Sequence, residues 1–173
     1  KYPMLFTGGA SSITHMHFDI DLSHILHTQF MGRKRVLLFP KTEQHKLYRK
    51  PFEVLSMADF SNYYDPDKSK LDYQQFPALR EARGYEITLE HGDTLFMPAG
   101  YWHHMEYIDS GFAMSLRALQ PSAIGKLNGV WNLFGMRNID TILKKTAPQP
   151  WYNWKKKKIF ENADRVLRNQ SAK

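Results

Sequence analysis

The sequence predicts a mainly β domain of short antiparallel strands, followed by an α-helical extension. Over the first 120 residues, short apolar or alternating stretches are separated by turn signals rich in glycine, proline and aspartate, which is typical of an antiparallel sandwich or barrel. After Pro121, apolar residues recur at helical spacing. We therefore expect a β domain over residues 1–120 and a helical extension over residues 121–173.

Each strand is placed by an apolar stretch and by the turn residues around it. The first strand lies within residues 1–13 and enters a turn at Gly8-Gly9. Further strands are predicted at residues 13–20, 25–30, 35–39, 85–89, 94–97, 103–108 and 112–119. Residues 41–83 are expected to be irregular, with a turn at 63–67 and a short helix at 77–82.

The helical extension is divided by two prolines. Pro148 and Pro150 interrupt the pattern, so a final helix is expected from Trp154 to Leu167. Before the prolines, an apolar stripe consists of Trp131, Leu133, Phe134, Ile139, Ile142 and Leu143. This stripe would pack either on the β domain or on a second subunit, and the sequence leaves both open.

The composition excludes several classes of site. The 173 residues include no cysteine, which excludes disulfides, cysteine-ligated zinc, iron–sulfur clusters and a thiol nucleophile. No apolar stretch is long enough to span a membrane. The lack of cysteine fits a reducing compartment, and we expect a cytoplasmic location. Because the chain begins with Lys1 inside apparent domain sequence, we expect that an N-terminal segment precedes it.

The net charge of +7 is concentrated at the C-terminal end. Residues 144–173 hold nine lysines and arginines against Glu161 and Asp164, whereas residues 1–143 are balanced. We interpret the basic end as a solvated helix and do not expect a nucleic-acid partner. The alternative is a nucleic-acid or membrane-surface binder that uses the aromatic and basic residues 151–158.

Three residues form a candidate metal site. His17 and Asp19 are two positions apart on a predicted strand, so both side chains point to the same side. His103 would have to be brought to them by the fold. Two imidazoles and one carboxylate are the ligand set that holds ferrous iron and leaves coordination positions open. The alternative is a set of polar residues hydrogen-bonded at the rim of a strand.

Two ordered blocks of sequence resemble the Jumonji C group of cupin-fold oxygenases. The first block is Thr-x-x-His-x-Asp, then Gln-x-x-Gly-x-Lys and a hydrophobic strand that ends in proline, here Thr14, His17, Asp19, Gln29, Gly32, Lys34 and Pro40. The second block is Gly-Asp-Thr-Leu-Phe-Met-Pro-Ala-Gly-Tyr-Trp-His-His at residues 92–104. The likeness covers residues 2–120. By these motifs, the chain is similar to the protein hydroxylases of this group, such as the hypoxia-inducible-factor asparaginyl hydroxylases.

The resemblance implies a double-stranded β-helix that uses iron(II) and 2-oxoglutarate to hydroxylate a side chain of a protein or peptide. It implies that His17, Asp19 and His103 hold the iron. It also implies that Lys34 pairs with the distal carboxylate of 2-oxoglutarate, assisted by the Thr14 hydroxyl. His103 rather than His104 is chosen because it follows Trp102 as in the family. Related hydroxylases often dimerise through C-terminal helices, so a homodimer is also implied.

Two departures from the family pattern leave questions open. Where relatives often carry an asparagine after the metal-binding aspartate, this chain offers His24 or His27. Where relatives often carry an asparagine on the last core strand, this chain has Arg117, which would clamp a cosubstrate carboxylate, mark another cosubstrate mode or form a structural ion pair. Arg117 therefore favours an alternative function, a non-catalytic cupin that binds a metal or small molecule.

Overall fold

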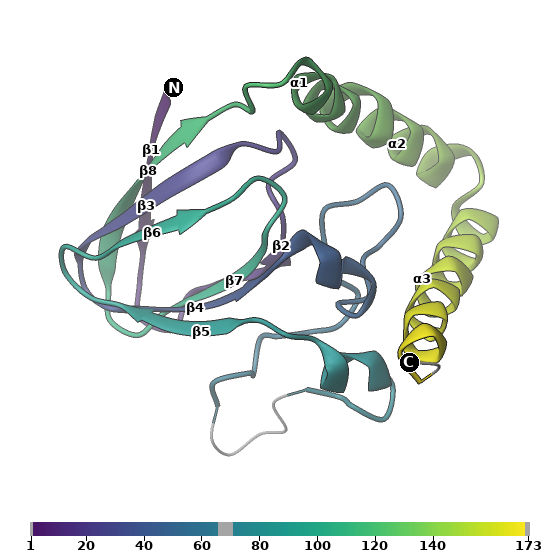
Figure 1. Ribbon diagram of the computed structural model, residues 1–173, viewed down its shortest axis with the longest axis horizontal. Coiled ribbons are helices and arrows are strands. Elements are labelled where there is room, and N and C mark those ends of the chain that lie inside the picture. The colour runs from purple at the N-terminus through teal and green to yellow at the C-terminus, as the bar shows by residue number, and fades with distance from the viewer. Residues whose placement is uncertain (1, 66–70, 172–173) are drawn as a thin grey trace.

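Two four-stranded antiparallel sheets face each other in the computed structural model, which describes residues 2–65 and 71–171 (Figure 1). One sheet has the order β1-β8-β3-β6, and the other has the order β2-β7-β4-β5. The strands are β1 (Tyr2–Gly8), β2 (Ile13–His17), β3 (His24–Met31), β4 (Lys34–Phe39), β5 (Tyr85–Leu89), β6 (Thr94–Met97), β7 (Trp102–Tyr107) and β8 (Gly111–Ala118). This confirms the predicted double-stranded β-helix with a C-terminal helical extension.

The strand expected at residues 13–20 is shorter than predicted. It ends at His17, because Asp19 starts a tight turn in which its carbonyl accepts a hydrogen bond from the Leu22 N–H over 3.0 Å. Leu22 itself has a positive φ of 52°, which a continuing strand does not allow. Asp19 therefore lies in the loop after the strand.

Apolar side chains pack on both faces of the β2-β7-β4-β5 sheet. Between the two sheets, Val36 and Leu38 of β4 join a buried cluster with Met105 of β7. On the outer face, Leu37 and Trp102 join a larger cluster to which residues 41–82 and the last helix contribute. Because side chains alternate along a strand, β4 is buried on both sides, which explains its continuous apolar sequence.

Residues 41–83 contain two short 3-10 helices, η1 (Lys41–His45) and η2 (Pro77–Glu81). The second helix lies where a short helix was predicted. Of the turn predicted at 63–67, residues 63 and 64 form part of a turn, whereas residues 66 and 67 lie outside the described residues.

The helical extension consists of α1 (Ala123–Val130), the π-helical η3 (Trp131–Met136), α2 (Arg137–Thr146) and α3 (Pro148–Ser171). The prediction that the last helix begins near Trp154 is wrong. Pro148 and Pro150 lie in the first turn of α3, where the missing N–H of proline costs no intrahelical bond. No described helix combines the length and the hydrophobicity that a membrane crossing requires.

A buried ionic network fixes the extension to the β domain. The Lys155 ammonium on α3 donates to Asp140 on α2 over 2.8 Å and also contacts Glu53. Lys144 and the Trp151 indole N–H bind the same Asp140 carboxylate over 2.7 Å and 2.9 Å. Burial alone would raise the pKa of Asp140, but these hydrogen bonds outweigh it and hold the pKa below its usual value.

Candidate metal centre

The pairing of β2 with β7 brings the two candidate histidine ligands side by side. His17 and His103 are direct partners in this antiparallel pair, and their ring centroids lie 4.2 Å apart. The Asp19 Oδ2 atom lies 3.9 Å from the His103 Nε2 atom. One ligand atom from each of the three residues lies within 4.8 Å of the others. The fold thus gathers the three residues of the predicted metal site.

A β-bulge in β2 makes this arrangement possible. Thr14 pairs with Met105, and His17 pairs with His103. Three steps along β2 therefore correspond to two steps along β7, so β2 carries one extra residue. On a regular strand, residues three apart point to opposite sides. The extra residue turns both Thr14 and His17 towards the space between the sheets, and both line the cavity found there.

The hydrogen bonds of both imidazoles leave the same nitrogen free for a metal. The His17 Nδ1 atom lies 2.8 Å from the His15 carbonyl oxygen, and the His103 Nδ1 atom lies 3.4 Å from the Tyr101 carbonyl oxygen. A carbonyl only accepts, so in the neutral ring each Nδ1 carries the proton and each Nε2 keeps the lone pair that a metal requires. Burial also holds the pKa of His103 well below its usual value, which keeps the ring neutral. Two neutral imidazoles and one carboxylate fit a divalent iron ion.

Arg117 binds the carboxylates next to this centre. Its Nη2 donates to the Asp19 Oδ1 over 2.7 Å, and its Nη1 lies 3.5 Å from the Asp21 Oδ1. This leaves the Asp19 Oδ2 directed towards His103. Asp21 in turn accepts hydrogen bonds from Tyr2 over 2.5 Å and from Ser23 over 2.8 Å. The sequence left three roles open for Arg117. The structure shows the ion pair, and a role of Arg117 in binding a cosubstrate stays a prediction.

The space between the sheets forms a cavity of about 220 Å³, called here the metal cavity. At about 30 Å³ for each water in the liquid, this corresponds to roughly seven waters, enough for a small organic acid. His17, Asp19 and His103 lie on its wall together with Thr14, Lys34, Arg117 and His27. Two cationic side chains face one carboxylate there, so the cavity suits an anion even before a metal adds its charge.

Lys34 is buried in this cavity without an acidic partner. Its side chain is 2% exposed, and no carboxylate among the described residues lies within ion-pair distance of it. Its ammonium donates to the His27 Nε2 over 3.0 Å and lies 4.2 Å from the centre of the Tyr107 ring. Burial lowers the pKa of Lys34 to about 8. A buried ammonium that lacks a counter-ion is suited to receive an anionic ligand.

His27, rather than His24, reaches the metal cavity. Burial, together with the charges of Lys34 and Arg117, lowers the pKa of His27 to about 3, so its ring is neutral. Its Nε2 accepts from Lys34, and its Nδ1–H therefore donates to the Ser115 hydroxyl over 2.7 Å. His24 instead stacks on Phe96 and accepts the Ala99 N–H.

Strand alternation separates His103 from its neighbour His104. His104 lies on the outer face of the sheet, is fully buried, and lies near Phe60 and Tyr64. Ser115 and Tyr107 also line the metal cavity but were not predicted from the sequence. Their spacing could have indicated this, because residues an even number of positions apart on a strand point to the same face. Tyr107 is four residues after His103, and Ser115 is two residues before Arg117.

Two facing sheets with a His-Asp-His set between them define the class of protein. The chain belongs to the cupin-like domain family, whose model matches residues 2–118. The Jumonji C and cupin resemblance drawn from the two sequence blocks is therefore confirmed.

Among known proteins, the chain is similar to HSPB1-associated protein 1 of Bos taurus, with 36% identity over 107 residues, which are 61% of this chain and 21% of that protein. A Danio rerio homologue of that protein is 41% identical over 83 residues, 47% of this chain and 17% of the homologue. Jumonji C domain-containing protein 5 of Drosophila melanogaster is 30% identical over 108 residues, 62% of this chain and 25% of that protein. The chain therefore spans a quarter or less of these relatives.

Proposed function

We propose that this chain is an iron(II)- and 2-oxoglutarate-dependent oxygenase that hydroxylates a side chain of a protein or peptide. One observation carries the proposal: the metal cavity holds both a His-Asp-His set within 4.8 Å and a buried lysine without an acidic partner. The first fits a divalent metal, and the second fits the carboxylate of an organic cosubstrate. The substrate class is proposed from the resemblance of the motifs to protein hydroxylases.

The chain would supply binding and orientation. The Nε2 atoms of His17 and His103 and the Oδ2 of Asp19 would hold the iron. Arg117 would fix the orientation of Asp19 by binding its other carboxylate oxygen. When bound, iron and 2-oxoglutarate would supply the oxidising power that, with dioxygen, converts a C–H bond to an alcohol and the cosubstrate to succinate and carbon dioxide.

Lys34 would anchor the distal carboxylate of 2-oxoglutarate. A bound carboxylate would replace the missing counter-ion, raise the pKa of Lys34 from about 8 and keep the ammonium charged. His27 would hold the ammonium in place, because its Nε2 is fixed as an acceptor by the hydrogen bond to Ser115. Thr14, on the wall of the same cavity, would contribute its hydroxyl to the same carboxylate.

The test measures succinate formed by the 173-residue chain with iron(II), 2-oxoglutarate and a peptide mixture. We expect succinate from the wild type and none from His103→Ala. His15→Ala is the matched control, because this exposed histidine lies on the same strand as His17 and outside the metal cavity. Anaerobic calorimetry should show tighter 2-oxoglutarate binding with the metal present than without it. No metal binding by the wild type would contradict the proposal.

The pairing of Arg117 with Asp19 supports a second candidate, a non-catalytic cupin. An arginine 2.7 Å from a metal-binding carboxylate competes with the ion for its charge. In that case, calorimetry would show metal and 2-oxoglutarate binding while succinate stayed at the level of His103→Ala. Use of residues 151–158 as a nucleic-acid surface has less support, because Trp151 and Lys155 are bound within the chain.

We also propose that the extension forms a homodimer. Of the predicted apolar stripe, Trp131, Phe134 and Ile142 are more than half exposed. Three large apolar side chains exposed along consecutive helical segments are typical of an interface rather than of a monomer surface.

A further inference from the structure

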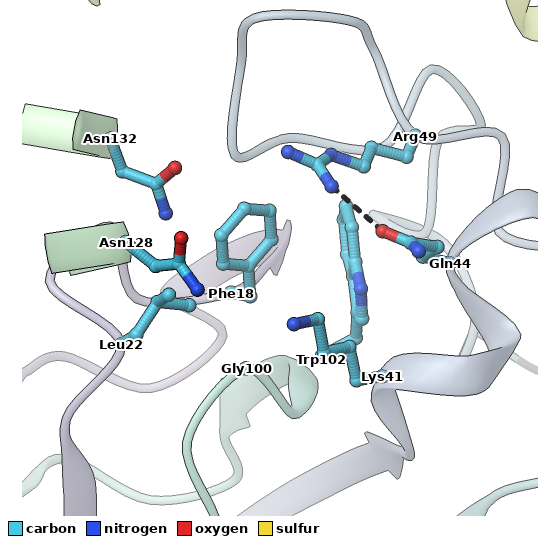
Figure 2. Close-up of a pocket in the computed structure, with 9 residues that line it drawn as sticks. All are labelled: Phe18, Leu22, Lys41, Gln44, Arg49, Gly100, Trp102, Asn128 and Asn132. Atoms are coloured by element: carbon cyan, nitrogen blue, oxygen red, sulfur yellow. Dashed lines mark hydrogen bonds between the residues drawn. The ribbon is translucent and has the colours of Figure 1, made fainter. Parts of the chain in front are cut away.

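A second pocket shares no lining residue with the metal cavity, and Figure 2 shows the residues that line it. Its volume is about 220 Å³, and it is lined by side chains of α1 and η3 on one side and of residues 41–49 on the other. Phe18 and Trp102 form its apolar wall, in contact with each other at 5.0 Å between ring centroids. Both aromatic residues are next to predicted metal ligands in the sequence, but their side chains line this second pocket and not the metal cavity. We call the second pocket the α1 pocket.

Arg49 provides the main polar group of the α1 pocket. Its Nη1 donates to the Gln44 Oε1 over 2.7 Å, as Figure 2 shows, and its guanidinium lies 4.9 Å from the centre of the Phe18 ring. Its Nη2 reaches only the Met136 sulfur, 3.8 Å away, and its Nε is buried without an acceptor. No described carboxylate lies within ion-pair distance. A guanidinium has five N–H donors, so most of the hydrogen-bonding capacity of Arg49 is unused.

Lys41 and Asn132 are further polar groups without partners. The aliphatic part of the Lys41 side chain packs against Gly100, where a Cβ would lie 3.2 Å from the lysine Cδ. The φ of Gly100 is +79°, which also favours glycine. Lys41 forms no ion pair with a described residue. Asn132 is 9% exposed, and its side-chain amide makes no hydrogen bond to a described residue. The Asn132 amide lines the pocket, where a ligand can pair with it.

The helix that carries the amides is held close by a glycine. A Cβ at Gly129 would lie 2.7 Å from the Asp21 carbonyl oxygen, so only glycine lets α1 approach the loop after β2 this closely. This contact places Asn128 and Asn132, one turn apart, opposite Arg49 (Figure 2). The α1 pocket is therefore formed by fixed elements.

We propose that the α1 pocket binds the carboxylate of an acidic side chain in a polypeptide partner. Its lining has two cationic side chains and no acidic one, and its volume suits one side chain. The apolar wall would contact the methylene groups of a glutamate. Ile124 and Leu127, four residues and one residue before Asn128 on α1, are 73% and 66% exposed and offer apolar contacts that a polypeptide can use and a free anion cannot. The proposal does not depend on turnover in the metal cavity.

The test uses nuclear magnetic resonance of the Arg49 Nε–H group in the 173-residue chain, assigned by its loss in Arg49→Lys. The probe is acetyl-Leu-Glu-Leu-amide, and the matched neutral probe is acetyl-Leu-Gln-Leu-amide. We expect a saturable shift with the acidic peptide, and at least tenfold weaker binding by Arg49→Gln, measured by fluorescence anisotropy of a labelled peptide. Lys41→Gln, at an exposed lysine, should weaken binding about threefold. Arg83→Gln, an exposed arginine outside the pocket, should change nothing.

Several results would overturn the proposal. Equal shifts with the neutral peptide would show that the carboxylate is not recognised. Tighter binding of inorganic phosphate at the same Arg49 signal would assign the α1 pocket to a free anion. Concentration-dependent shifts without peptide would assign it to a second copy of the chain. Unchanged peptide binding in Lys41→Gln and Arg49→Gln would place the peptide elsewhere on the surface.

Discussion

Replacing Lys34 with methionine should stabilise the protein alone and abolish its response to 2-oxoglutarate. Methionine keeps a flexible side chain of similar length and removes the ammonium, which is 2% exposed and has no acidic partner. In the folded wild type, burial lowers the pKa of this lysine to about 8 from its usual value of 10.5. Below pH 8, the folded wild type therefore pays a free-energy cost for burying the charged ammonium, and the methionine variant does not.

The size of this effect follows from the shift in pKa. A difference of about 2.5 pKa units corresponds to roughly 3 kcal/mol. The variant loses the hydrogen bond to His27 and the contact with the Tyr107 ring, together about 1–2 kcal/mol. We therefore expect a net gain of about 1–2 kcal/mol at pH 7. Because the folded pKa is depressed, wild-type stability should rise as the pH increases from 8 towards 10.5, and this rise should be missing in the variant.

The assay is urea unfolding at pH 7 and pH 10, with and without 2-oxoglutarate and a redox-inert divalent metal. Lys126→Met, at an exposed lysine on α1, is the control for the loss of a positive charge. The cosubstrate should stabilise the wild type and the control but not Lys34→Met. A Lys34→Met variant that is less stable than the control at pH 7, or that responds to 2-oxoglutarate like the wild type, would refute the reasoning.

Further predictions concern the ligands, the network and the extension. His103→Ala should lower iron affinity at least tenfold by calorimetry while leaving the circular dichroism spectrum unchanged. Arg117→Gln should weaken iron binding about tenfold through the misoriented Asp19, whereas a loss confined to 2-oxoglutarate would identify a cosubstrate clamp instead. Lys155→Ala should cost about 3 kcal/mol in urea unfolding, because it leaves buried carboxylates less well paired, and a loss no larger than that of Lys156→Ala would contradict this. Phe134→Asp, at a side chain 65% exposed, should convert a dimer to a monomer in sedimentation equilibrium, and a monomeric wild type would rule the dimer out.

The three candidate metal ligands, which the fold brings together, could be chosen from the sequence because their residue types are rare in this spacing and because the two blocks that carry them occur in order. The sequence placed His17 and Asp19 on one strand, whereas Asp19 lies in the turn that follows. A bulge cannot be read from alternation, since inserting one residue changes which side chains face inwards. The orientation of Thr14 therefore had to come from the pairing of β2 with β7.

Long-range contacts were the other part that the sequence did not contain. Arg117 lies 98 positions from Asp19, and only the neighbouring positions of β8 and the loop after β2 show that they pair. The prolines of α3 were read as breaks in a helix because spacing alone does not tell the first turn from the interior.

The contact between Gly129 and the Asp21 carbonyl has a consequence for the centre itself. Asp21 and Asp19 both pair with Arg117, so the helix that packs against this loop also limits how far Asp19 can move from the two imidazoles. If the proposed centre holds a metal, a change in the packing of this helix should therefore change its metal affinity, although no atom of the helix is among the proposed ligands.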